Sequence, residues 1–187
     1  LLHGLRASAA RFFPALLLIA LAGCSAPLPP PPPPSPEEIA TVEARRKHKQ
    51  AAELLQQKDT DGALTLALES LELRRTVLGE SSPETESALE LLGDIYFARG
   101  QLDVAEQVLT RSLAIRTLLV GADDPALAEV LDRLFVVHDR QGKLDRAGEV
   151  ISRSVALRKA AGGPPSYELA LALLNLGAVH LRQCRLD

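Results

Sequence analysis

Apolar residues recur at spacings of three and four through most of the chain, a pattern typical of amphipathic helices. Between residues 83 and 119 two such stripes follow one another, with Gly100 between them: Ala88, Leu89, Leu92, Ile95, Tyr96, and then Ala105, Val108, Leu109, Leu113. The whole pattern predicts helices near 37–57, 61–77, 83–98, 103–119, 125–140, 145–160 and 166–182. Ser35, Pro36 and Glu38 predict a capping box at the start of the first helix.

The pattern repeats with a constant offset of 42 residues, which is the spacing between Gly100 and Gly142. The segment QLDVAEQVLTRSLAIR at 101–116 returns as KLDRAGEVISRSVALR at 143–158. The same offset links four sets of residues: Asp61, Asp103, Asp145 and Asp187; Ala63, Ala105 and Ala147; Arg74, Arg116 and Arg158; Gly79, Gly121 and Gly163. Each period holds two helices that cannot bury their apolar stripes alone, so neighbouring pairs must stack.

Leu92, Gly93 and Tyr96, followed by Gly100 and Ala105, resemble the signature of the tetratricopeptide repeat. The next repeat departs from this signature, with Phe135 in place of the glycine and His138 in place of the tyrosine. The 42-residue period is similar to that of the kinesin-light-chain subtype. The resemblance implies an all-α solenoid of helical hairpins, a right-handed superhelix over residues 37–187 with about 3.5 repeats.

The first 23 residues have the layout of a signal peptide, with Arg6 and Arg11 before an apolar run. That run is shorter than the ~20 residues that a transmembrane helix needs. Residues 21–24, LAGC, resemble the lipobox of bacterial lipoproteins. The resemblance implies lipidation of Cys24 and a place in the cell envelope, at the outer membrane facing the periplasm. Residues 24–36 are then a proline-rich spacer, or alternatively a docking peptide for a proline-binding partner.

Composition narrows the classes of partner and of protein that fit this chain. The chain is 47% apolar but 3% aromatic, and its net charge is −3. Nucleic-acid binding requires a basic face and stacking rings, so we expect no such partner. The two cysteines do not make a disulfide framework.

Few residues suggest a catalytic or metal-binding role. His138 and His180 are equivalent positions one period apart and can be interpreted as metal ligands or as packing substitutions for the tyrosine of the repeat. His180 and Cys184 can be interpreted as two zinc ligands, or Cys184 as a substitution in the turn column of Gly100 and Gly142. We favour the structural interpretation of both pairs. With no nucleophile or phosphate-binding motif, we expect no catalytic residue, metal, cofactor or small-molecule substrate.

The resemblance implies instead a groove, lined by the first helix of each pair, that binds an extended peptide. Position by position, the groove residues are Ser87, Glu90, Asp94, Phe97, Glu129, Asp132, Val136, Asp139, Leu171, Leu174, Asn175 and Ala178. Asn175 matches an asparagine of the subtype that contacts peptide backbone, whereas Leu91 and Arg133 replace it in the two preceding repeats. The acidic residues suggest a partner with Lys or Arg, the alternative being an ordinary solvated helix face.

The last residues, Arg185–Asp187, match positions just before a second helix, so the fourth repeat is truncated. We expect the last helix to expose an apolar face of Leu169, Leu173, Leu176 and Val179. A fragment, a dimer interface or a capping protein would each explain such a face, and a fragment is favoured. The sequence predicts a membrane-anchored scaffold that binds a partner protein. The alternative is the sensing module of a longer enzyme, such as a caspase-like protease.

Overall fold

The computed structural model describes residues 33–162, 164 and 166–184. Pro34–Asp187 forms one compact unit. Within the described residues the helices are α1 (Pro36–Gln56), α2 (Thr60–Leu78), α3 (Pro83–Ala98), α4 (Leu102–Val120), α5 (Leu127–Gln141), α6 (Leu144–Ala160) and α7 (Tyr167–Gln183). The predicted signal peptide, Cys24 and most of the proline linker lie outside this part of the chain.

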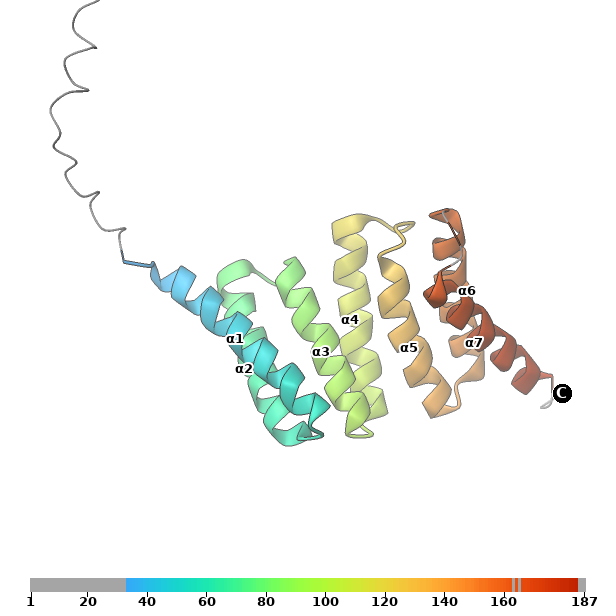
Figure 1. The fold of residues 1–187 in the computed structure, drawn as a ribbon, viewed down its shortest axis with the longest axis horizontal. Helices are drawn as coiled ribbons and strands as arrows, with labels where there is room; N and C mark the ends of the chain where they lie inside the picture. Colours follow the sequence, from blue (N-terminus) through green and yellow to red (C-terminus); the bar gives the residue numbers. More distant parts are fainter. Residues whose placement is uncertain (1–32, 163, 165, 185–187) are drawn as a thin grey trace, which may run out of the picture. The chain divides into compact units, whose positions relative to one another are not determined.

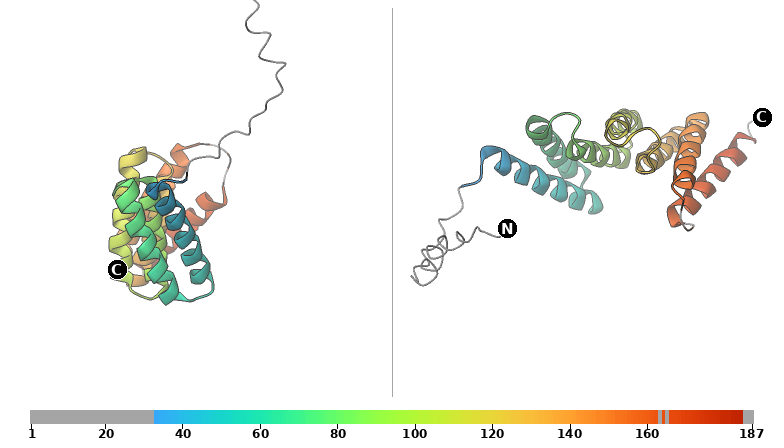
Figure 2. Two further views of the ribbon diagram at one scale, coloured as in Figure 1. Left: turned by 90° about the vertical axis from the view of Figure 1, so that its left-hand side faces the viewer. Right: turned by 90° about the horizontal axis from the view of Figure 1, so that it is seen from above.

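The helices form antiparallel pairs that stack side by side, as Figures 1 and 2 show. α1 packs on α2, α3 on α4 and α5 on α6, and each second helix also packs on the first helix of the next pair. First helices also touch one another, α1 with α3 and α3 with α5. This arrangement confirms the predicted all-α solenoid of helical hairpins.

Capping residues in the local sequence determine where several of the helices begin. Ser35 accepts a hydrogen bond from the Glu38 amide while the Glu38 carboxylate accepts one from the Ser35 amide, which is the predicted capping box. Ser82 and Ser166 cap α3 and α7 in the simpler way, through one backbone amide each.

The start of α5 differs from the prediction, which placed it at Pro125. The helix begins at Leu127, because the carboxylate of Asp124 accepts a hydrogen bond from the amide of Ala126 at 2.8 Å and holds a turn instead of a cap. Two bonds of the 3₁₀ type, Leu127 to Asp124 and Ala128 to Pro125, lead from this turn into the helix.

Small residues allow the helices of each pair to approach. Ala63, Ala105 and Ala147, one in each pair, are fully buried. Larger side chains form apolar clusters that together include residues of every helix from α1 to α7. The predicted core face of the repeat is therefore confirmed.

The apolar face predicted for α7 is largely wrong. Val179 is buried, and Leu169 and Leu176 are half-buried, because all three pack toward α6 and Phe135. Of the predicted residues, only Leu173 is exposed. The other large apolar residues that α7 exposes are Tyr167, Leu171, Leu174 and Leu181. None of the described helices is long and apolar enough to cross a bilayer.

The turn between the helices of a pair has the same geometry three times, and one copy lacks glycine. Gly100 and Gly142 have φ of +72° and +74°, and Lys58 in the same column has φ of +66°. In each turn this residue donates its amide to the carbonyl three residues before, for example from Lys58 to Leu55 at 3.0 Å. A lysine in this left-handed region is strained, whereas glycine is not.

Replacing Lys58 with glycine should therefore raise the free energy of unfolding by about 1 kcal/mol. Urea titration followed by circular dichroism measures this change. The reciprocal control is Gly100→Ala, which has open space for the new methyl group but an unfavourable φ, and should lower stability by about the same amount. A Lys58→Gly variant less stable than wild type would contradict the strain argument.

Candidate functional site

The first helices α1, α3, α5 and α7 share one side of the stack (Figure 1), and we call their common surface the first-helix face. The predicted groove residues lie on three of these helices, α3, α5 and α7. Their exposure is uneven: Glu129, Val136, Leu171, Leu174 and Ala178 are exposed, Ser87, Asp94, Phe97, Asp132, Asp139 and Asn175 are half-buried, and Glu90 is buried.

Glu90 sits between two arginines from different helices. Its carboxylate lies 3.0 Å from the guanidinium of Arg116 on α4 and 3.5 Å from that of Arg133 on α5. Its Oε1 is buried without a hydrogen bond. Burial raises the pKa of Glu90 to about 7, although the charge of Arg133 opposes the shift.

Arg133 joins α3 to α5. Its Nε lies 3.2 Å from Asp94 on α3, and its Nη1 lies 3.0 Å from Glu129 on α5 itself. The pKa of Asp94 is raised by burial, and Arg133 works against that rise. Arg133 thus replaces the asparagine of the subtype with a side chain that binds acids of its own chain.

The other two acids of α5 are also paired within the chain. Asp132 receives both Nη atoms of Arg158 on α6, at 2.6 and 3.1 Å, and the hydroxyl of Ser154 at 2.6 Å. Asp139 forms an ion pair with Arg182 on α7. Each predicted acid of the groove therefore has at least one arginine partner before any ligand binds.

The positions of the acids on the first helices can be predicted from the sequence, but their arginine partners were not predicted. Arg116 and Arg158 recur one period apart in the sequence, and both lie on second helices, outside the predicted groove. The column could have revealed them, because arginines that repeat on a buried helix face must find acceptors.

Apolar and aromatic residues lie beside the charged ones. The guanidinium of Arg140 on α5 stands 5.7 Å above the ring of Phe97 on α3, a cation–π distance. Val136 exposes 42% of its surface and Leu174 exposes 71%, on α5 and α7. The first-helix face thus offers apolar surface next to charged groups, which suits a polypeptide better than a small polar molecule.

The raised pKa of Glu90 predicts a pH dependence of stability. Between pH 4.5 and about pH 7 the carboxyl group of Glu90 stays protonated in the folded chain but is ionised in the unfolded chain. The contribution of Glu90 to the free energy of unfolding is therefore largest below pH 4.5 and falls as the pH rises toward 7. Relative to Glu90→Gln, the wild-type chain should lose about 1–2 kcal/mol between about pH 5 and pH 8.

Urea titrations of both proteins across this pH range measure the difference. Comparing variants is necessary because burial lowers the pKa of His48 to about 4, which makes its own contribution rise with pH in the same window. Ser87→Ala, on the same helix as Glu90, removes no titratable group and is the matched control, whose stability difference from wild type should not change with pH. A constant difference between wild type and Glu90→Gln would contradict the assignment.

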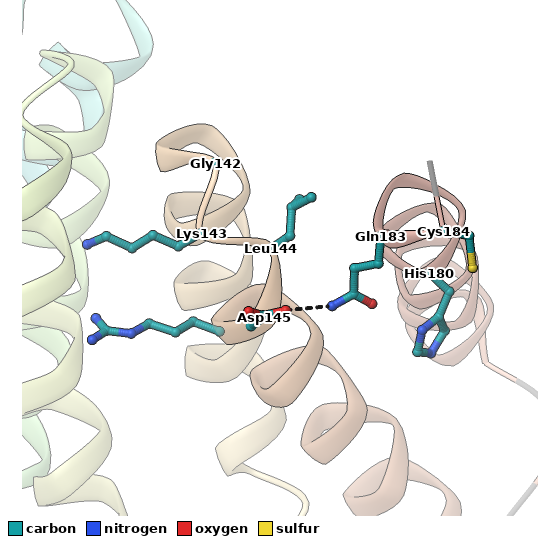
Figure 3. A pocket seen from close by; sticks show the side chains of 8 residues that line it. Gly142, Lys143, Leu144, Asp145, His180, Gln183 and Cys184 are labelled. Atoms are coloured by element: carbon teal, nitrogen blue, oxygen red, sulfur yellow. Dashed lines mark hydrogen bonds between the residues drawn. The ribbon is translucent and has the colours of Figure 1, made fainter. Parts of the chain in front are cut away.

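The histidines and Cys184 occupy different surroundings. His138 is buried, with Nδ1 3.3 Å from the Gln141 side-chain oxygen, whereas His180 is exposed. An open cleft of about 860 Å³ lies between the α5–α6 turn and the end of α7, lined by Gly142, Lys143, Leu144, Asp145, Arg146, His180, Gln183 and Cys184 (Figure 3). Gln183 spans it by donating to Asp145 at 3.1 Å.

This cleft does not gather metal ligands. Lys143 points away from His180 (Figure 3). Lys143 and Arg146 both bind Glu106 of α4, at 2.6 and 2.8 Å. Cys184 is a free, exposed thiol. Within the part of the chain that the structure describes, no group of three or more His, Cys, Asp or Glu could hold a metal ion.

The stacked helical hairpins and the first-helix face, which suits a polypeptide, are typical of a helical repeat protein that acts as a scaffold. The tetratricopeptide repeat family matches residues 44–118 and 84–147, together more than half of the 187 residues. The chain belongs to the tetratricopeptide repeat family. Repeats of this family indicate a protein–protein interaction scaffold, and the fold is typically non-catalytic.

Solved structures show the same fold. BtubC (BKLC) from P. vanneervenii matches with a TM-score of 0.70 and 21% identity, over 75% of this chain and 56% of that one. A putative kinesin light chain from Podospora anserina, with nearly identical TPR-like repeats, matches with a TM-score of 0.67 and 18% identity, over 75% and 66%. The chain thus spans less than two thirds of either protein. No curated protein matches the sequence.

Proposed function

We propose that the chain is a membrane-anchored adaptor whose first-helix face binds an extended peptide of a partner protein. The family supports the adaptor role. The signal-peptide layout and the LAGC motif support a lipid on Cys24, with residues 24–36 as a spacer between the membrane and the repeats. The location proposed is the outer membrane, facing the periplasm.

The observation that carries the peptide-binding proposal is the excess of acid on α3 and α5. The ion pairs of this surface join six carboxylates to four arginines, and Arg140 above Phe97 is a fifth arginine on the same face. The carboxylates are those of Glu86, Glu90, Asp94, Glu129, Asp132 and Asp139, and the paired arginines are Arg116, Arg133, Arg158 and Arg182. Glu129 keeps 64% of its side chain exposed and Asp94 keeps 41%. A lysine or arginine of a peptide laid over α5 can pair with these groups without displacing an internal partner.

The test is selection from a random peptide display library on the immobilised full chain. We expect captured peptides to be enriched in Lys or Arg, and Glu129→Lys to reduce their capture by about tenfold or more. Glu72→Lys makes the same charge change at an exposed position of the second helix α2 and should leave capture unchanged. Equal capture by wild type and Glu129→Lys would overturn the proposed surface.

The anchor has a separate test. Expressed in a Gram-negative host, the full chain should fractionate with membranes, and the mass of its N-terminal peptide should equal that starting at Cys24 plus acyl groups. Cys24→Ala should release the protein from the membrane fraction while the isolated repeats still bind peptide. An unmodified Cys24 in the wild-type protein would overturn the anchor and leave the peptide-binding proposal standing.

A further inference from the structure

A row of apolar residues runs along the exposed side of α7. Its members follow one another at alternating spacings of four and three residues, as in the seam of a coiled coil. They are Tyr167, Leu171, Leu174, Ala178 and Leu181, which we call the α7 seam. All five are exposed, and Tyr167, Leu174 and Leu181 expose 78%, 71% and 68% of their surfaces. So regular a row of large exposed side chains indicates a contact with another helix.

The seam is separate from the side of α7 that packs in the fold. Val179 is 1% exposed and belongs to the cluster shared with α6. A second helix of a repeat packs as α6 packs on α5, and there the positions equivalent to Leu171 and Ala178 hold Glu129 and Val136. Both of these residues stay exposed beside α6. The packing of the repeat therefore leaves this row of positions open.

The polar groups beside the α7 seam are arranged symmetrically. α7 has one acid, Glu168, and one arginine, Arg182, and Asn175 lies midway between them, seven residues from each. All three lie on the same flank of the seam, because each directly follows a seam residue. Glu168 is exposed, and Arg182 keeps 46% of its side chain exposed although it pairs with Asp139 of α5. A second α7 that crosses the first antiparallel at Asn175 therefore brings Glu168 of each copy beside Arg182 of the other.

We propose that two copies of this chain associate through their α7 seams, with the two helices antiparallel and a two-fold axis beside Asn175. This pairing covers the exposed leucines of both copies and sets Leu174 of one against the small Ala178 of the other. It also forms the Glu168–Arg182 ion pair twice. A parallel pair would hold these two charges at opposite ends of the helices, so the charges favour the antiparallel pair. The seam is thus self-complementary, as a two-fold interface requires.

The association gives α7 a role apart from the proposed peptide site. Four predicted groove residues, Leu171, Leu174, Asn175 and Ala178, then contact the second copy. The peptide-binding proposal depends on the acids of α3 and α5, which lie outside the α7 seam. A dimer carries two such acidic faces, so a partner with two peptide segments binds it with higher apparent affinity than it binds one copy.

Analytical ultracentrifugation over a dilution series tests the association, on the full chain with Cys24→Ala so that no lipid contributes. We expect the mass to rise with concentration toward twice that of the chain. Leu174→Glu places a charge in the middle of the seam and should weaken the association by about tenfold or more. Leu68→Glu makes the same change at an exposed position of α2 and should leave the association unchanged. Circular dichroism checks that both variants fold.

Cross-linking tests the arrangement of the two helices, in a chain that also carries Cys184→Ser. Asn175→Cys should cross-link to the second copy through a short bis-maleimide, because the two-fold axis passes beside this position. Leu181→Cys should not, because antiparallel helices hold the two copies of this residue far apart. Cross-linking of Leu181→Cys in preference to Asn175→Cys would overturn the antiparallel arrangement.

A chain that stays monomeric at every concentration, or a dimer that Leu174→Glu leaves unchanged, would overturn the inference. If the chain is monomeric and Leu174→Glu instead reduces capture from the peptide library, the α7 seam binds the partner peptide and not a second copy. Glu129→Lys lies outside the seam and should leave the measured mass unchanged. Loss of peptide capture and loss of association are therefore separate results, and the two proposals can fail independently.

Discussion

Replacing Phe135 with alanine should lower the free energy of unfolding by about 3–5 kcal/mol, the largest effect expected of a single side chain here. Phe135 is 7% exposed and is the member from α5 of the buried cluster that joins α5, α6 and α7. Its neighbours include Ile151 of α6 and Val179 of α7, so the truncation leaves a cavity between three helices. α7 packs mainly on α6 and should lose its protection first.

Urea denaturation followed by circular dichroism gives the loss of stability, and hydrogen exchange shows whether α7 opens before the rest. Phe97→Ala is the matched control, because Phe97 is half-buried on the first-helix face and should lose far less. Equal losses from the two truncations, or exchange of α7 unchanged by Phe135→Ala, would show that the α5–α7 cluster does not hold the last helix.

Phe135 also shows how far the repeat pattern could predict the fold. The constant period, the buried alanines of the second helices and the glycine turns predicted each helix that the structure describes and the pairing of these helices. These features depend on spacing and local conformation, which the sequence displays directly. Phe135 stands where the pattern has glycine, and it still packs in the core, because repeat units tolerate a change of size when neighbouring helices adjust.

The charged residues were less predictable because their partners come from other helices. The position of Asp132 predicts a groove residue, yet in the structure its carboxylate binds the guanidinium of Arg158, 26 residues further along the chain. Such pairing depends on how two helices are rotated about their axes. The same rotation turns Val179 toward α6, where the sequence predicted an exposed face.

These internal pairs change the interpretation of the surface. A row of acids on the first helices suggests a strongly negative groove, but arginines from α4, α5, α6 and α7 neutralise most of it. What remains is a smaller acidic excess, at the partly exposed carboxylates of Asp94 and Glu129. Specificity on this face therefore depends on which charges the chain leaves unpaired, rather than on how many it carries.

Gly93→Ala should lower the free energy of unfolding by about 1–3 kcal/mol, although alanine is the better helix former. A Cβ at Gly93 would lie 2.5 Å from Cδ2 and 2.6 Å from Cγ of Leu109, which is itself 1% exposed and packed on all sides. Leu109 cannot withdraw into solvent, so α3 and α4 must separate to admit the methyl group. Glycine at this position is therefore required by the close contact of the two helices.

Gly177 on α7 occupies the same column two repeats later and supplies the control. Nothing lies within 4 Å of a Cβ built there. Gly177→Ala should therefore raise stability by about 0.5–1 kcal/mol, through helix propensity alone. Thermal and urea denaturation of both variants measure the two changes. Opposite signs for the same substitution in equivalent positions would show that the contact with Leu109 selects glycine at 93. Changes of the same sign would show that the requirement belongs to the helix and not to the contact.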